Sequence, residues 1–312
     1  MHPAFSVIFF TVASGAGYGL FIVFTLVQLF GWLKLSAQSV LIVGIIALVL
    51  ITAGLLSSTF HLANPKNAWR AFFRFRTSWL SREGVFAVLF YPLGLAYLYS
   101  AWLAQGGTNP WVILFGLGAV LLAFVTVFST GMIYACLKTI RQWNTALTPT
   151  NYVLLALASG TVLLVCLSAI MGYPVAPLAA LATVLVFIAA ITKAIYYFWI
   201  KTVTGPTINT ATGFTQAQVR LLDTGHSAGT FLTDEFAYQA PQRLLKQLKL
   251  IVYGLAFLVP LLLMALLASG YGGWPLALLA VVSLAVGLGV ERWLFFAEAR
   301  HVVNLYHGAQ HT

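Results

Sequence analysis

The chain has 312 residues, of which 61% are hydrophobic and only 7% are charged, and its formal net charge is +10. Because a soluble domain carries about 25% charged residues, this composition excludes a protein with a fully hydrated surface and predicts an integral membrane protein. The excess of basic residues is then expected to report membrane topology and contact with anionic headgroups, rather than nucleic-acid binding.

Eight apolar segments are long enough to cross a bilayer, which takes roughly 20 helical residues. They cover residues 4–33, 37–61, 83–104, 110–137, 151–172, 175–200, 247–268 and 274–299. The pattern predicts an all-α polytopic membrane protein, an eight-helix bundle forming a single anchor domain over residues 1–312. The first segment lacks the basic region of a signal peptide, so it is predicted to be a span. Its small residues at 15–19 (GAGYG) favour close helix packing.

Basic residues concentrate at one end of the predicted bundle. With eight spans, both termini and the connectors after the second, fourth and sixth spans share one side, and fourteen of the sixteen Lys and Arg residues fall there. The opposite side has only Lys34, while Lys193 lies within the sixth span. The positive-inside rule therefore predicts that both termini are cytoplasmic. The long connector at 201–246 is polar and rich in turn residues, and is predicted to be a docking surface.

The stretch at 57–92 gathers most of the polar chemistry of the first half of the chain. His61 closes the second span and titrates near neutral pH when unperturbed. Glu83 opens the third span, where the helix N-terminus favours a carboxylate. A proton donor and a carboxylate near the membrane interface suit quinone chemistry, which moves two electrons and two protons. Aromatic residues such as Trp69 offer stacking surfaces. The alternative is structural, because basic and aromatic residues are common at a cytoplasmic interface.

Several other functions find little support in the sequence. No Walker motif, nucleophile elbow, H-E-x-x-H or dinucleotide fingerprint occurs in a fitting context. Cys136 and Cys166 lie in apolar runs without a C-x-x-C pattern, which argues against a metal cluster in this chain. No histidine is mid-span, which argues against a b-type haem, although a single haem between His61 and His301 stays open.

A membrane transporter is the alternative from a different functional class. Ion and proton pathways usually place ionisable groups within the membrane. The candidates here are Lys193, Glu291 and Arg292, and all three lie nearer the cytoplasmic end of their spans than the midplane. Inverted repeats with broken helices are not visible in the sequence either.

Two runs resemble a known family. The first is FHLANPKNAWRAFFRFRTSWLSREG, which resembles the H-L-x-x-P-x-x-A…R…S-x-L-S-x-E segment of DmsC-type membrane anchors. These anchors are subunits of molybdopterin enzymes of the DMSO reductase family. The second is the N-terminal run MHPAFSVIFFTVASGAGYG, which is more similar to the anchors of the sulfite-oxidising members. The likeness extends over the whole chain.

The resemblance implies a three-subunit complex in the bacterial inner membrane. Its catalytic subunit holds molybdenum bis-molybdopterin guanine dinucleotide (Mo-bis-MGD), and a ferredoxin-like subunit holds [4Fe-4S] clusters. The anchor itself has no molybdenum chemistry; it binds quinone (ubiquinone or menaquinone) and neither haem nor metal. The implied quinone site maps onto His61 and Glu83, with Trp69 and Arg82 as further candidates. The basic residues expected to dock the cluster-bearing partner are Lys66, Arg70, Arg74 and Arg76.

Members of this family differ in the side of the membrane that this connector faces. In the DMSO reductase anchors the corresponding connector faces the periplasm, whereas the five basic residues of this connector predict a cytoplasmic location. This favours a sulfite dehydrogenase, in which electrons from sulfite pass through molybdenum and the clusters to a quinone. The runner-up is the anchor of a DMSO reductase-type or other sulfur-oxyanion enzyme that oxidises quinol.

Overall fold

The structure is a computed structural model that describes residues 1–60, 64–223, 230, 236, 238 and 240–312. Within these residues the regular structure is helical, and β-pairing is limited to two isolated bridges. Eight helices are long and apolar enough to cross a membrane, as predicted. They are α1 (Phe5–Leu29), α2 (Ala37–Thr59), α3 (Trp79–Leu103), α4 (Pro110–Ala135), α5 (Leu147–Ile170), α6 (Ala176–Thr202), the continuous helix α9–η2–α10 (Gln242–Ala268) and α11 (Trp274–Ala297). Shorter helices are η1 (Pro65–Arg74), α7 (Ile208–Thr212) and η3 (Val302–His307).

Three spans, α3, α5 and the seventh, begin four or five residues earlier than their hydropathy predicts. Helix α3 begins at Trp79 because the Ser78 side chain accepts a hydrogen bond from the Ser81 amide, which caps a polar first turn. The seventh span begins at Gln242 with a basic, amphipathic turn. It passes through a π-helical segment, Val252–Leu258, just before Pro260. Proline lacks an N–H and its ring clashes with the preceding turn, so a local π segment is a common accommodation.

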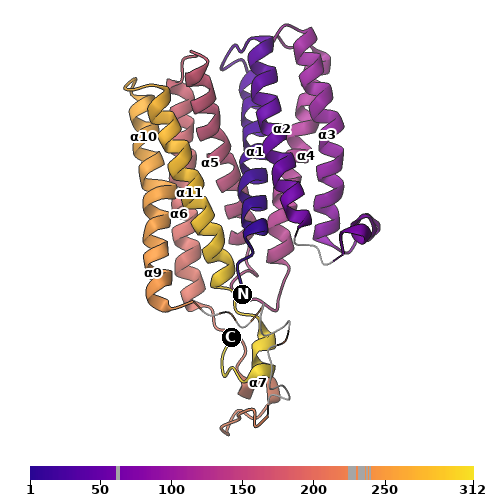
Figure 1. The fold of residues 1–312 in the computed structure, drawn as a ribbon, viewed down its shortest axis with the longest axis vertical. Coiled ribbons are helices and arrows are strands. Elements are labelled where there is room, and N and C mark those ends of the chain that lie inside the picture. Colours follow the sequence, from indigo (N-terminus) through magenta and orange to yellow (C-terminus); the bar gives the residue numbers. More distant parts are fainter. Residues whose placement is uncertain (61–63, 224–229, 231–235, 237, 239) are drawn as a thin grey trace.

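Helix α1 forms the centre of the bundle, where it contacts α2, α4, α5 and α11 (Figure 1). Glycines bring its backbone against α5. A Cβ atom at Gly19 would lie 1.7 Å from the carbonyl oxygen of Ala156, and one at Gly160 would lie 2.1 Å from the backbone of Gly19. Gly17 approaches the α2 backbone at Ala47 in the same way. The prediction that residues 15–19 allow close helix packing is therefore confirmed.

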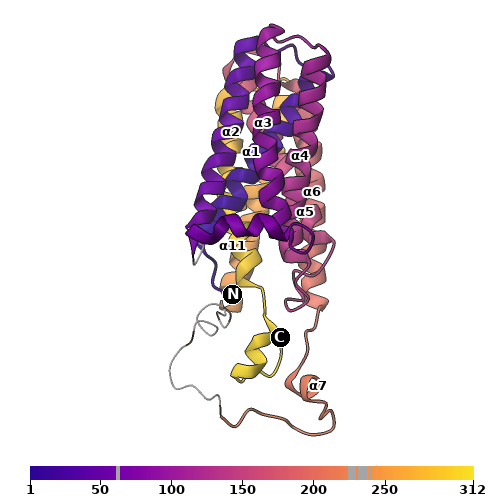
Figure 2. The ribbon, with the colours of Figure 1, turned by 90° about the vertical axis from the view of Figure 1, so that its right-hand side faces the viewer.

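One end of the bundle, the basal end, carries both termini and the large connectors (Figure 1). Helix η1 lies across the foot of α2 and α3, roughly perpendicular to them (Figure 2). The C-terminal segment folds back on the same end: the Val302 amide donates to the Thr139 carbonyl at 3.1 Å, and the Gly205 amide donates to the Thr312 carbonyl at 2.9 Å. The polar side chains discussed below lie near this basal end.

Candidate functional site

The two residues predicted to form the quinone site lie on either side of the connector between α2 and α3 in the sequence. His61 lies outside the described residues. Glu83 is the fifth residue of α3, one turn in from the basal end, and is only 5% exposed. Its carboxylate turns into the bundle and accepts a hydrogen bond from the hydroxyl of Thr130 on α4. Thr130 also donates to the Thr126 carbonyl at 3.1 Å, which orients its side chain along α4.

Arg82 contacts a different part of the structure from Glu83, although the two are adjacent in sequence. Its guanidinium donates to the carbonyl oxygens of Phe75 (3.0 Å) and Arg76 (2.9 Å) and stacks over the Trp79 ring at 4.2 Å. Successive residues on a helix point about 100° apart, so the arginine stays with the connector while the carboxylate enters the core. Arg82 thus ties the connector to the first turn of α3.

Helix η1 presents basic and aromatic side chains at the surface. Trp69 is 56% exposed; its ring packs edge-on against Phe73 at 5.7 Å, and the Arg70 guanidinium lies 5.7 Å from its centroid. The predicted docking residues Lys66, Arg70, Arg74 and Arg76 are all exposed. The connector therefore presents a basic, aromatic surface to solvent, whereas the nearby carboxylate of Glu83 on α3 faces the interior of the bundle.

A small polar cavity lies on the inner side of Thr130. It has a volume of about 30 Å³ and is bounded by residues of α1, α4, α5 and α11, among them Tyr18, Thr130, Tyr152 and Arg292. A cavity of this size has room for one or two water molecules. Glu83 is thus separated from an internal polar space by a single hydroxyl group, that of Thr130.

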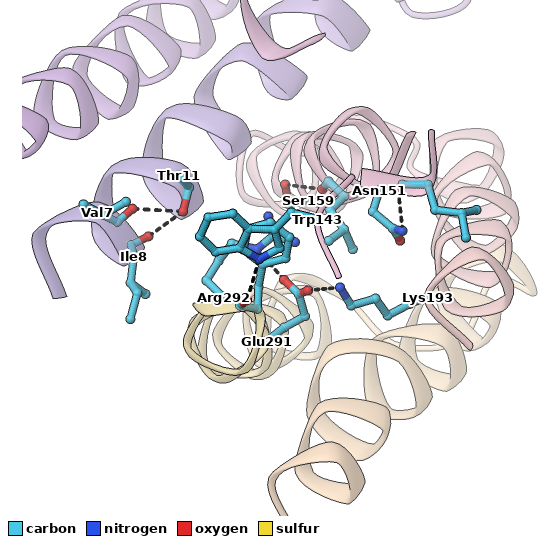
Figure 3. A network of polar contacts seen from close by, with 12 residues as sticks. Val7, Ile8, Thr11, Trp143, Asn151, Ser159, Lys193, Glu291 and Arg292 are labelled. Carbon is cyan, nitrogen blue, oxygen red and sulfur yellow. Dashed lines mark hydrogen bonds and ion pairs between the residues drawn. The ribbon is translucent and has the colours of Figure 1, made fainter. Parts of the chain in front are cut away.

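Two cations and one anion are buried next to this cavity, which Arg292 lines, and Figure 3 shows their contacts. Glu291 on α11 pairs with Lys193 of α6 through one carboxylate oxygen and with its neighbour Arg292 through the other. All three side chains are at most 5% exposed. The Arg292 guanidinium lies 4.2 Å from the centroid of the Tyr152 ring on α5. Charges at this depth in a membrane protein are costly, so such a cluster is a functional-site candidate by default.

Aromatic rings enclose these three charged residues from the basal side. The Trp143 indole donates to the Phe295 carbonyl at 2.9 Å, and its ring stacks on that of Phe295 at 5.1 Å. The rings of Tyr134 and Tyr196 pack on Phe295 as well, at 5.3 Å and 6.4 Å. Aromatic walls exclude bulk water and strengthen the electrostatic interactions behind them.

A second cavity adjoins the polar one and is almost wholly apolar. It has a volume of about 250 Å³ and lies between α1, α2, α5 and α11, with Val12, Ala16, Ser159 and Leu288 lining both cavities. Two further lining residues, Phe9 and Ala285, are exposed on the outer surface of the bundle. The apolar cavity therefore extends from the face that lipid covers to the polar cavity.

Some of these residues are recognisable from the sequence and others are not. Glu291, Arg292 and Lys193 are ionisable residues within apolar spans, a pattern that by itself indicates transport. Tyr18, Thr130 and Tyr152 carried no signal, because a lone hydroxyl in an apolar helix is usually a packing residue. Among the residues that the structure describes, no three His, Cys, Asp or Glu side chains gather as a metal site.

The comparisons with known proteins cover nearly the whole chain. The family model described as DMSO reductase anchor subunit (DmsC) matches residues 1–297. The chain is also similar to a sulfite dehydrogenase subunit from Allochromatium vinosum, with 36% identity over 327 residues, 98% of this chain and 99% of the relative. Such coverage leaves no large segment of either chain unmatched. The chain is therefore a multi-pass membrane protein of the DMSO reductase anchor subunit (DmsC) family.

Proposed function

We propose that this chain is the quinone-reducing membrane anchor of a molybdenum and iron–sulfur sulfite dehydrogenase. One observation carries the proposal: a chain whose whole length aligns with a sulfite dehydrogenase subunit buries a carboxylate, Glu83, one turn above a basic and aromatic connector. A buried carboxylate held by a single hydroxyl, that of Thr130, is free to exchange a proton with a ligand beside it.

The reaction balances across the complex. Sulfite and water give sulfate, two electrons and two protons at the molybdenum subunit. The [4Fe-4S] clusters of a ferredoxin-like subunit would carry these electrons to the anchor, where a ubiquinone or menaquinone would take up two electrons and two protons and become quinol. In this chain, His61 hydrogen-bonds a quinone oxygen, while Glu83 passes protons between the pocket and the basal surface. Trp69 and Arg82 shape the connector side of the site.

Charge supports a cytoplasmic position for the basal end. Fourteen of the sixteen Lys and Arg residues belong to segments on the same side of the membrane as the two termini, and most of these are in the basal connectors. At the other end of the bundle, Lys34 lies in the short α1–α2 connector. The positive-inside rule then orients both termini toward the cytoplasm of a bacterial cell, where the catalytic and cluster subunits would bind. On this orientation, sulfite oxidation releases two protons on the side from which quinone reduction takes up two.

The docking surface for the cluster subunit is formed by η1 and the 201–246 connector. Helix η1 lies across the basal end, and α7 of the connector projects beyond it (Figure 2). Lys66, Arg70 and Arg74 of η1, and Arg76 just after it, are exposed to solvent. A partner with an acidic face would be steered by these charges, and its last cluster would come to rest next to the connector.

The purified three-subunit complex tests the proposal through two electron acceptors. Ferricyanide accepts electrons before the quinone step, so sulfite-to-ferricyanide turnover reports the partner subunits alone. His61→Ala and Glu83→Gln are expected to lower sulfite-to-quinone turnover at least tenfold while ferricyanide turnover is retained. The control is Glu298→Gln, a carboxylate at the same end of the bundle that pairs with Lys249 at 2.6 Å.

The outcomes separate the parts of this proposal. Unchanged quinone turnover in both variants would remove His61 and Glu83 from the site. A wild-type complex that oxidises no sulfite with either acceptor would contradict the sulfite dehydrogenase assignment itself.

A further inference from the structure

Resting on the proposed function, we propose where the quinone ring binds: in the apolar cavity between α1, α2, α5 and α11. One quinone oxygen then accepts hydrogen bonds from Arg292 and from the hydroxyls of Tyr18 and Tyr152 in the adjoining polar cavity. This places the ring inside the bundle, on the opposite side of Thr130 from Glu83 and away from the connector, so Trp69 and Arg82 would not contact the ring itself.

Three hydrogen-bond donors that line the polar cavity lack a good acceptor within the protein. Tyr18, Tyr152 and Arg292 are 1%, 6% and 4% exposed, and all three line the polar cavity. Among the described residues, neither tyrosine hydroxyl nor the Nη2 atom of Arg292 makes a well-formed hydrogen bond, although the Tyr18 hydroxyl lies near Thr126 and the Tyr152 hydroxyl near Arg292. Buried polar groups are nearly always paired, so three unpaired groups on one cavity indicate a ligand or water that accepts from them. A carbonyl oxygen fits such a set of donors.

The volume and lining of the adjoining apolar cavity limit which ligand can bind there. Its volume of about 250 Å³ exceeds the roughly 150 Å³ of an engineered cavity that binds benzene, so a single ring fits within it. Because its lining is apolar and reaches lipid-exposed Phe9 and Ala285, a ligand enters from the bilayer without crossing water. A molecule with an apolar body, a ring and a hydrogen-bond-accepting oxygen is a lipid-soluble quinone.

Arg292 is positioned for this role by the ion pairs behind it. Its Nε donates to Glu291, which Lys193 holds from α6, so the guanidinium is fixed with Nη2 free. Lys193 and Glu291 form a neutral pair, which leaves the charge of Arg292 unbalanced within the cluster. Negative charge that develops on a quinone oxygen as it gains electrons is stabilised by this unbalanced cation.

Glu83 completes the site as the proton carrier. Its carboxylate reaches the polar cavity through Thr130, whose hydroxyl both donates to Glu83 and lines the cavity. Each quinone oxygen gains one proton as the two electrons supplied by the cluster subunit arrive, and the quinol leaves through the apolar cavity to the bilayer. Glu83 is reprotonated from the basal surface.

The tyrosine hydroxyls give the sharpest test. Tyr18→Phe and Tyr152→Phe each delete a hydroxyl that makes no well-formed hydrogen bond to the protein, so the folded chain is expected to lose little stability. If each hydroxyl binds the quinone, the KM for a decyl-substituted benzoquinone or naphthoquinone rises by about three- to tenfold per variant, while sulfite-to-ferricyanide turnover is unchanged. Arg292→Lys, which loses the planar fork, raises KM further.

The entrance is tested with a matched pair on α11. Ala285 lines the apolar cavity, whereas Val286, the next residue, is 51% exposed and lies outside it. Ala285→Phe is expected to block quinone entry and abolish labelling of α1 and α11 by an azido-quinone. Val286→Phe places the same ring in lipid and leaves both turnover and labelling intact.

Opposite results would overturn this inference. A wild-type KM in both tyrosine variants or full turnover in Ala285→Phe would each contradict it. So would azido-quinone labelling confined to residues 57–92. Finally, a phospholipid acyl chain that stays in the cavity at saturating quinone would show that the cavity holds lipid instead. If His61→Ala and Glu83→Gln still abolish quinone turnover in that case, the proposed function stands and only the ring position is wrong.

Discussion

The carboxylate of Glu83 on α3 and the hydroxyl of Thr130 on α4 form a buried hydrogen bond that connects the base of α3 with the interior of the bundle. Thr130→Val removes the donor while keeping the side-chain volume. A buried carboxylate that loses a hydrogen bond is destabilised by roughly 1–3 kcal/mol, so its exchange of protons with the quinone site is impaired. We expect lower quinone turnover in Thr130→Val and a pH profile that differs from that of the wild type.

Thr130→Ser is the control for this variant, because it keeps the hydroxyl and loses only a methyl group. Quinone turnover is measured from pH 6 to 9 in both variants, with ferricyanide turnover as the measure of intact partner subunits. A pH profile of Thr130→Val that coincides with that of the serine variant would show that the hydrogen bond does not influence Glu83.

The contact of α1 with α5 makes a separate prediction about assembly. Gly19→Ala places a methyl group 1.7 Å from the Ala156 carbonyl oxygen, which forces the two helices apart. The matched control is Gly289→Ala on α11, where a Cβ meets nothing within 4 Å and alanine is favoured by up to about 1 kcal/mol in a helix. Gly19→Ala is expected to lower the thermal midpoint in detergent and the yield of complex, whereas Gly289→Ala retains both. Equal midpoints would contradict the close packing of the two backbones.

The cluster of Lys193, Glu291 and Arg292 predicts strongly coupled effects on stability. Glu291→Gln leaves two buried cations without their counter-ion, and breaking a buried pair costs on the order of 3–5 kcal/mol. Adding Lys193→Gln restores the original net charge of the cluster, so the double variant is expected to be more stable than Glu291→Gln alone. Thermal midpoints of the two single variants and the double variant measure the coupling. Additive losses would mean that the three charges do not act as a unit.

Much of the fold was predictable, because membrane spans depend on local composition. The eight spans, and the packing role of the glycines in 15–19, follow from hydropathy and residue size alone. The start of α3 was not predictable from hydropathy, since Ser78 caps a polar turn. The relation between Lys193 and Glu291 depends on how two spans about 100 residues apart meet in space, which no local pattern encodes. For the same reason the sequence placed Glu83 at a helix start but not facing Thr130.

The exposed basic face of η1 predicts an electrostatic contribution to docking. Arg74→Glu combined with Arg76→Glu reverses two exposed charges, so association with the cluster subunit is expected to weaken, and to do so more at 50 mM than at 300 mM salt because screening reduces the repulsion. Lys34→Glu reverses an exposed charge at the opposite end and serves as the control. Co-elution of the three subunits in gel filtration measures the effect. Unchanged co-elution at low salt would place the partner elsewhere.

His301 predicts how pH affects the C-terminal segment. Its Nδ1 accepts a hydrogen bond from the Val303 amide at 3.0 Å, which caps η3, and partial burial lowers the pKa of this imidazole below its ordinary value of 6.5. Because the folded pKa lies below the unfolded one, the stabilisation is complete above about pH 6.5. It is lost as the pH falls from there through the folded pKa, where Nδ1 becomes protonated.

Hydrogen exchange at the Val303 amide, compared at pH 7.5 and pH 5.5 after correction for the intrinsic rate, measures this loss. His301→Asn is the matched variant, because asparagine is a good helix cap that does not titrate. Protection in the wild type is expected to fall between the two pH values while protection in His301→Asn stays level. A parallel fall in both proteins would assign the pH effect to another group, because a side chain without a titratable proton cannot lose its cap through protonation.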